Sequence, residues 1–283
     1  AILMLGLSAG FLGSFAEKIG PKKSGLLAML FWVTGLLGTA YALSIHNLTL
    51  LYLFYGIIGG IGLGIGYITP VSTLVKYFPN RPGFATGLAI MGFGFASLIA
   101  GPLMQYLVAQ VGLVNTFIIL GVIYLVIMGA SSLYLKAPQP KHSTRTTKDR
   151  STMYVHTHGM LANDAMKTWQ FGALWWVFFI NITCGIGLLS LASPMAQETI
   201  GMTPAAAASL VGIIGIFNGG GRIAWSTISD YLGRAQTYIL FFISEIIAFY
   251  LLATTNSALT FQILILLIIT CYGGGFSCMP AYL

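Results

Sequence analysis

The sequence predicts an all-α polytopic membrane protein, built as a bundle of about nine transmembrane helices, and three observations support this fold class. First, 57% of the 283 residues are hydrophobic and only 7% are charged, with a mean hydropathy of +0.88. Soluble domains carry about 25% charged residues, so this composition excludes a soluble core. Second, the apolar residues form long segments, and third, the basic residues gather in alternate loops.

Nine apolar segments have the length that an α-helix needs to cross a bilayer, roughly 17–25 residues. They cover residues 1–16, 24–45, 49–77, 83–109, 113–135, 169–193, 204–228, 236–254 and 258–280. Two of them, 49–77 and 83–109, are longer than one crossing requires, so we expect their ends to bend or to leave the membrane. The 35 glycines lie within the apolar segments, as is typical of closely packed membrane helices.

In the first half of the chain, each predicted helix boundary coincides with a break in the apolar pattern. Gly20 permits a tight turn after the first segment, and the uncharged loop Ile45–Asn47 follows the second. The fourth segment contains Pro102, which removes one backbone hydrogen bond and favours a bend that serves either packing or gating. Gln110–Gly112 then separates the fourth segment from the fifth.

The one long polar stretch is Lys136–Thr168, which contains six basic and two acidic residues. It is too short and too polar to form a domain, so we expect a solvated linker over 137–168. This linker divides the chain into an N-terminal helical bundle over 1–136 and a C-terminal helical bundle over 169–283. Three of the four histidines lie in it, but no other feature predicts a metal site.

Twelve of the thirteen lysines and arginines lie on one side of the predicted bundle, and the thirteenth is Arg222. The alternate loops carry neither residue; they are Ile45–Asn47, Gln110–Gly112, Gln197–Met202 and Thr254–Ser257. By the positive-inside rule, the basic side faces the cytoplasm. We therefore expect a protein integral to the lipid bilayer of the plasma (inner) membrane, with the linker 137–168 cytoplasmic. The same distribution argues against nucleic acid as the partner that explains the net charge of +7.

Two loops on the basic side share one pattern at an offset of 213 residues: a small residue, an acid, a glycine and a base. A carboxylate at such a helix end can pair with a base or cap the N-terminus of a neighbouring helix. Gly13 is small enough for close helix approach, and the glycines permit tight turns. The alternative is two ordinary helix-turn-helix loops. We predict gating roles for Gly13, Glu17, Gly20, Lys22, Asp230, Gly233 and Arg234, together with Pro102.

Arg222 is the most informative single residue, because it lies in the otherwise uncharged apolar stretch Ser209–Ile228. A cation at the centre of a membrane helix costs roughly 2.5–3.5 kcal/mol, so such residues usually face a polar path and meet an anion. Asn218 lies four residues earlier on the same helix face, and a guanidinium matches a carboxylate with two parallel hydrogen bonds. The pattern predicts an anion site. The alternative is a structural ion pair, with Glu245 as the partner.

Three further residues are candidates for the substrate site. Tyr67 could offer a hydroxyl to a bound anion or be a plain core residue. Phe93 lies between two glycines and could form an apolar wall. Asn181 lies deep in the sixth segment and could line the transport path.

The paired loops resemble the signature of the major facilitator superfamily, in which this motif follows helix 2 and recurs after helix 8. The resemblance implies a two-bundle architecture and a fragment covering helices 2 to 10 of twelve. Further segments resemble the oxalate/formate antiporter family: Gly59–Pro70, Arg81–Gly87, Ala192–Gln197, Asn218–Arg222 and Cys271–Pro280. In that family, the arginine at the position of Arg222 binds a substrate carboxylate. Gly273–Gly275 and Cys278 stand where aromatic side chains would narrow a cavity for oxalate, so a different small carboxylate fits as well.

These patterns predict a secondary active transporter that moves small organic anions, mono- or dicarboxylates such as formate or oxalate, by alternating access. We expect a monomer that is not an enzyme and needs no cofactor or metal, since the sequence shows no catalytic motif. Protons are a possible coupling ion, and antiport and symport both stay open. Two alternatives remain: a transporter of a neutral or cationic solute on the same fold, and a non-transporting membrane receptor.

Overall fold

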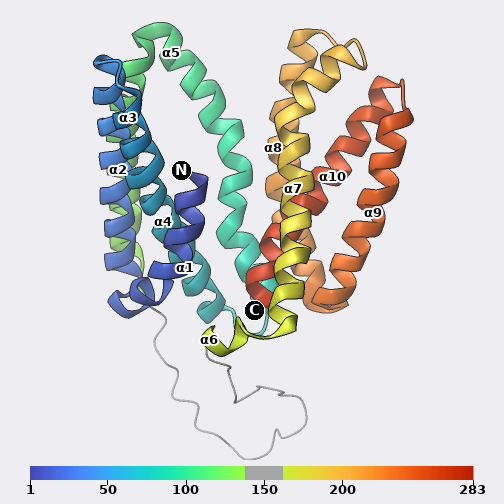
Figure 1. Cartoon of the computed structure of the whole chain (residues 1–283), viewed down its shortest axis with the longest axis horizontal. Helices are drawn as coiled ribbons and strands as arrows, with labels where there is room; N and C mark the ends of the chain where they lie inside the picture. Colours follow the sequence, from blue (N-terminus) through green and yellow to red (C-terminus); the bar gives the residue numbers. More distant parts are fainter. Residues whose placement is uncertain (138–161, 283) are drawn as a thin grey trace, which may run out of the picture.

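The computed structural model describes residues 1–137 and 162–282, and these residues form helices and no strand (Figure 1). In chain order the helices are α1 (Ile2–Ile19), α2 (Pro21–Ser44), α3 (Leu48–Leu51), the π-helical stretch η1 (Tyr52–Ile58), α4 (Gly59–Tyr77), α5 (Pro82–Tyr134), α6 (Ala162–Ala165), α7 (Trp169–Glu198), α8 (Pro204–Leu232), α9 (Arg234–Thr254) and α10 (Ala258–Tyr282). Eight stretches of the described chain are long and apolar enough to cross a membrane.

One of these eight stretches, α5, crosses twice. Its 53 residues would measure roughly 80 Å as a straight helix, far more than a bilayer needs. The backbone leaves the helical region at Gly112, where φ is 78°, a conformation that favours glycine. Figure 1 shows α5 turning back there into two antiparallel arms. The prediction of about nine crossings is therefore close, with its boundary at Gln110–Gly112 in the right place.

The predicted bend at Pro102 stays a prediction. The helix continues through this position, and Gly112 is the residue with non-helical backbone angles inside α5. The long segment 49–77 is irregular near its start, where η1 has π-helical geometry between α3 and α4; whether its ends bend or leave the membrane stays a prediction. There the ring of Phe54 packs directly over Gly38 of α2, where a Cβ atom would lie 2.1 Å from the ring.

The helices form two groups on either side of a central seam (Figure 1). In the first group, α1, α2, α4 and the second arm of α5 pack together, and Ala16, Ala28 and Ile65 form a small buried core. In the second group, α7, α8, α9 and α10 enclose a larger apolar core around Ile214, Phe261 and other aliphatic side chains. The predicted linker 137–168 lies mostly outside the described residues, so the domain boundary stays a prediction.

The first arm of α5 and α8 form the seam between the groups, and small residues bring their backbones together. A Cβ atom added at Gly83 would lie 2.1 Å from the carbonyl oxygen of Ser226. At Gly94 it would lie 2.2 Å from the backbone nitrogen of Gly219. Small residues of this kind allow close helix approach in membranes, where packing drives helix association. The seam therefore depends on glycine at specific positions of α5.

We predict that Gly94→Ala lowers the thermal stability of the protein, while Gly92→Ala leaves it unchanged or slightly raises it. Both positions are helical and undergo the same substitution. Nothing lies within 4 Å of a Cβ atom at Gly92, whereas Gly94 faces the α8 backbone. Overpacking costs about 1–3 kcal/mol, and alanine favours a helix by up to about 1 kcal/mol over glycine. Unfolding in detergent, followed by intrinsic fluorescence, measures the difference. Equal midpoints for the two variants would contradict the close seam.

The loops without lysine or arginine lie at one end of the bundle, and those that carry them lie at the other (Figure 1). We predict that single cysteines at Asn47 or Ser257, in a cysteine-free background, react with an impermeant thiol reagent added outside intact cells. A cysteine at Lys23 should react only after the cells are permeabilised. All three positions are exposed, so accessibility does not favour one of them. Labelling of Lys23→Cys in sealed cells would reverse the predicted orientation.

Candidate functional site

Arg222 lies in the seam with only 3% of its surface exposed. Its Nε–H donates to Oδ1 of Asn218 at 3.3 Å, and Nη1 donates to the backbone carbonyl of Ile90 on α5 at 3.4 Å. The guanidinium carbon lies 4.8 Å from the centre of the Phe276 ring. A guanidinium has five N–H donors, so these two hydrogen bonds leave most of its donor capacity available.

No carboxylate pairs with Arg222 among the described residues, where the ion pairs are Lys76–Glu17, Lys167–Asp164 and Arg234–Asp230. The alternative ion pair with Glu245 is therefore wrong. That carboxyl lies on α9, and its Oε1 atom is buried without any hydrogen-bond partner in the described part of the chain. Arg222 is thus a buried cation without a counter-ion among residues 1–137 and 162–282.

Aromatic side chains from four helices form one cluster that reaches the guanidinium through Phe276. Phe276 of α10, which stacks on Arg222, contacts Tyr67 of α4, with ring centres 6.0 Å apart, and Phe178 of α7, with ring centres 5.6 Å apart. Tyr67 in turn contacts Phe93 of α5 at 5.8 Å. The structure therefore brings the predicted residues Tyr67, Phe93, Asn218 and Arg222 into one cluster, through a phenylalanine that the sequence reasoning missed.

The sequence could have indicated Phe276, because Tyr272 lies four residues before it and therefore on the same face of α10. In the structure the two rings are in contact. The neighbouring glycines, Gly273 and Gly275, lie against α8 and α7 instead of against the guanidinium. A Cβ atom at Gly273 would lie 2.5 Å from the backbone oxygen of Asn218, and one at Gly275 would meet the side chain of Asn181. These glycines let α10 close onto α8 and α7. An aromatic side chain does narrow the site, but it comes from Phe276, next to the glycines.

Asn181 is fully buried, and neither its Oδ1 nor its Nδ2 atom has a hydrogen-bond partner among the described residues. It faces Gly275 of α10 within the second helix group. No contact joins it to Arg222 in the described residues. Its predicted role in lining the path stays a prediction.

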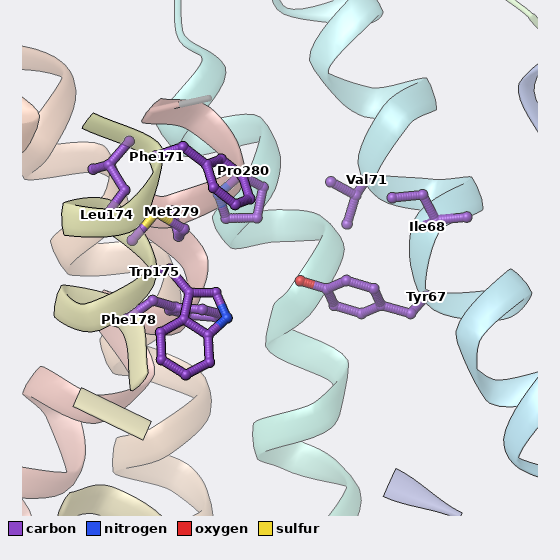
Figure 2. A pocket seen from close by; sticks show the side chains of 9 residues that line it. All are labelled: Tyr67, Ile68, Val71, Phe171, Leu174, Trp175, Phe178, Met279 and Pro280. Carbon is purple, nitrogen blue, oxygen red and sulfur yellow. The ribbon is translucent and has the colours of Figure 1, made fainter. Parts of the chain in front are cut away.

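A cavity of about 270 Å³ adjoins this cluster, between α4 of the first group and α7 and α10 of the second. Figure 2 shows the residues that line it: Tyr67, Ile68, Val71, Phe171, Leu174, Trp175, Phe178, Met279 and Pro280. The hydroxyl of Tyr67 points between the two walls (Figure 2). Tyr67 and Phe178 also contact Phe276, so the cavity and the guanidinium lie on adjacent sides of the same aromatic cluster.

Asp230 connects the two helix groups at the basic end of the seam. Its two carboxylate oxygens accept hydrogen bonds from the backbone N–H groups of Gly83 and Phe84, each at 2.9 Å. These N–H groups begin α5, so the carboxylate caps that helix and meets the positive end of its dipole. Arg234 pairs with Asp230 and also donates to the backbone oxygen of Ser226 at 3.2 Å.

The first copy of the loop motif behaves differently. Glu17 forms an ion pair with Lys76 at 2.9 Å, inside the first helix group, with both side chains about half exposed. Gly20 and Gly233 make the predicted tight turns, with φ of 83° and 93°. Gly13 does not allow the close approach that we predicted, because an added Cβ would meet only Ile68, at an ordinary 3.8 Å. Lys22 is exposed.

Comparison with known families identifies this arrangement. The family model of the Major Facilitator Superfamily matches residues 1–283. The chain belongs to the Major Facilitator Superfamily. Its members are transporters and not enzymes, as predicted.

Several relatives share this superfamily. The chain is 28% identical to the uncharacterized MFS-type transporter YhjX of Escherichia coli over 99% of its length and 67% of that protein. It is 26% identical to the oxalate:formate antiporter of Oxalobacter formigenes over 81% of the chain and 52% of that protein. The apicoplast pyruvate carrier 1 of Toxoplasma gondii is 21% identical over 98% of the chain and 61% of the carrier. The chain thus spans about half to two-thirds of these relatives.

Among solved structures, the fucose:proton symporter FucP of Escherichia coli has a TM-score of 0.61 with 14% identity, covering 99% of this chain and 78% of that one. This likeness shows the fold alone. A second structure of FucP, described as an outward conformation, has a TM-score of 0.56.

The unequal surroundings of the two motif carboxylates predict unequal effects of neutralising them. Asp230→Asn removes a buried charge that caps α5 across the seam, and hydrogen bonds to charged groups contribute about 1.5–3 kcal/mol. Glu17→Gln removes a half-exposed ion pair, typically worth about 0–1 kcal/mol. We expect Asp230→Asn to separate a fluorophore pair at the ends of α4 and α8 and to lower the unfolding midpoint. Glu17→Gln should change both much less. Equal effects would show that the seam does not depend on the cap.

Proposed function

We propose that this chain forms most of a secondary active transporter that moves small organic anions, mono- or dicarboxylates such as formate or oxalate, by alternating access. One observation carries the proposal: Arg222 is buried at the seam between the two helix groups without a carboxylate partner among the described residues. A cation in a membrane interior is costly unless an anion neutralises it. A bound carboxylate supplies that anion.

The surroundings of Arg222 suit a ligand that binds reversibly. Its contact with the Phe276 ring is worth about 0.5–2 kcal/mol, whereas each hydrogen bond between a guanidinium and a carboxylate contributes about 1.5–3 kcal/mol. An arriving carboxylate therefore displaces the ring. Asn218 holds Nε from one side, which orients the rest of the planar group. Tyr67 and Phe93 supply the apolar wall and a hydroxyl beside it.

The position of the site suits alternating access. Arg222 is on the second helix group and bonds to Ile90 on α5, while the cavity has walls from both groups. Transport requires the two groups to separate first at one end and then at the other. The Asp230 cap on α5 holds the basic end closed here, and breaking it would open that end. Gating by Glu17, Gly20, Lys22, Gly233 and Arg234 belongs to the same proposal.

The relatives support the substrate class. The oxalate:formate antiporter and the apicoplast pyruvate carrier 1 are named for small carboxylates, and part of this chain is 30% identical to the human monocarboxylate transporter 14. We propose further that the protein acts as a monomer in the plasma (inner) membrane, with the basic end in the cytoplasm.

We predict that Arg222→Lys weakens carboxylate binding markedly in the full-length protein, because it keeps the charge but loses the planar fork. Arg222→Gln should abolish binding, because each lost charge-assisted hydrogen bond lowers the affinity for a carboxylate roughly tenfold or more. Uptake of radiolabelled oxalate, formate and pyruvate into proteoliposomes, with thermal shifts on adding each acid, measures both effects.

Lys167→Gln is the matched control. It removes a cation whose side chain is largely exposed, and it should bind and transport as the wild type does. Arg222→Gln should fold normally, and adding Glu245→Gln should not alter it, because no ion pair or hydrogen bond joins these two residues in the described part of the chain. Wild-type carboxylate transport by Arg222→Gln would place the site elsewhere. Uptake of a neutral or cationic solute without competition from carboxylates would favour the rival function on the same fold.

A further inference from the structure

The second helix group contains an unexplained polar pair. In the described part of the chain, three buried side-chain nitrogen or oxygen atoms lack a hydrogen-bond partner: Oδ1 and Nδ2 of Asn181 and Oε1 of Glu245. Asn181 is fully buried, and Glu245 is 3% exposed. Unpaired buried polar atoms are rare in native proteins, and each one requires an explanation such as a bound water, an ion or a proton-transfer role.

The two side chains lie in one layer between α7, α9 and α10. Glu245 of α9 interacts electrostatically with Cys184 of α7 and Cys271 of α10. Asn181 precedes Cys184 by about one turn of α7, and it faces Gly275, which follows Cys271 by one turn of α10. Asn181 and Glu245 are therefore about one helical turn apart in depth, on facing sides of the same layer.

The ionisable groups on the neighbouring helices decide whether Glu245 carries a charge. Cys184 and Cys271 are the ionisable groups that α7 and α10 present to it, and neither can neutralise an anion. On α8, Arg222 is directed to Asn218, Ile90 and Phe276, and Arg234 at the start of α9 pairs with Asp230. A buried carboxylate without a cation is very costly and takes up a proton instead. Burial of Glu245 without a cation therefore favours uptake of a proton.

Glu245 is also the one acid of six that lies in the middle of a membrane-spanning helix. Glu17, Glu198 and Asp230 lie at or near helix ends, and Asp149 and Asp164 lie in the sequence between α5 and α7. Asn218, next to Arg222, cannot titrate. Among the six acids of this sequence, Glu245 is the one placed within the span of a membrane helix, where it could carry a proton.

Helix α10 links this layer to the anion site. Gly273 packs against Asn218 and Arg222 on one face of α10, while Cys271 and Gly275 face Glu245 and Asn181 on the opposite face. These positions lie within four residues, so the two sites are at the same depth. A shift of α10 when an anion replaces Phe276 on Arg222 also moves one wall of the layer around Glu245.

We propose that Glu245, together with Asn181, is the proton-binding site of this transporter. The Glu245 carboxylate takes one proton from water on one side of the membrane, forming an O–H bond. It releases that proton to water on the other side in the same cycle. Asn181 offers both a donor and an acceptor to the acid or to a bridging water. The identity of the co-transported anion rests on the function proposed above, and a monocarboxylate then crosses with one proton and no net charge.

Proteoliposomes containing the full-length protein test the coupling. In the wild type, an imposed pH gradient should drive accumulation of radiolabelled pyruvate above equilibrium. Glu245→Gln keeps the shape of the neutral acid, so we expect normal folding and normal pyruvate counterflow exchange. Accumulation should fall to the level measured without a gradient. Glu198→Gln removes an exposed carboxylate at the end of α7 and should keep full accumulation. Gradient-driven accumulation by Glu245→Gln, or none by the wild type despite exchange, would overturn the proposal.

A second measurement does not depend on any substrate. Infrared spectra of the wild type should contain the carbonyl band of a protonated carboxyl group, which Glu245→Gln removes and Glu198→Gln keeps. Asn181→Leu should shift the frequency of this band, because it removes the polar neighbour. If the band is present but no carboxylate binds, the proposed substrate class fails and the proton site survives. If carboxylates bind but the band is absent from the wild type at neutral pH, the proton site fails alone.

Discussion

The cost of holding the Arg222 guanidinium in the membrane interior constrains the structure around it. The only polar atoms that reach the guanidinium in the described residues are the side-chain oxygen of Asn218 and the carbonyl of Ile90. Asn218 lies on α8 itself, whereas the Ile90 carbonyl reaches Arg222 only because α5 lies very close to α8. Gly87 meets the backbone of α8 at Arg222, and Gly273 meets its side chain from α10. The glycines of the seam thus follow from the need to surround one cation with backbone oxygen and aromatic faces.

The two motif loops show how far one sequence pattern can diverge in its contacts. Asp230 and Glu17 occupy equivalent positions at an offset of 213 residues. Asp230 caps the first turn of α5 across the seam, with little exposure, whereas Glu17 pairs with Lys76 inside its own helix group. The difference lies in which helix N-terminus stands opposite each loop. Sequence alone identifies a carboxylate at a helix end, and the fold decides whether it joins two groups.

Much of the fold was predictable, because hydropathy and charge are local properties of the sequence. The approximate helix boundaries and the turn at Gln110–Gly112 followed from them. The hydrogen bond from Arg222 to Asn218 followed from a four-residue spacing. Contacts between helices did not follow. Phe276, the Ile90 carbonyl and the backbone N–H groups that meet Asp230 come from distant segments. The predicted close approach at Gly13 was wrong, because it depends on where the neighbouring helix lies.

Arg222 and Glu245 answer the same energetic problem in different ways, on opposite faces of α10. A guanidinium keeps its proton in proteins, so burying it leaves only one route to neutrality, which is to bind an anion. A carboxyl group can instead become neutral by binding a proton. In the proposed transport cycle, each site is neutral only when it is occupied, one by an anion and the other by a proton. An occupied, neutral site crosses the low-dielectric interior more easily than an empty, charged one. In the proposed transport cycle, the two residues together would therefore favour movement with both ligands bound or with both charges exposed to water.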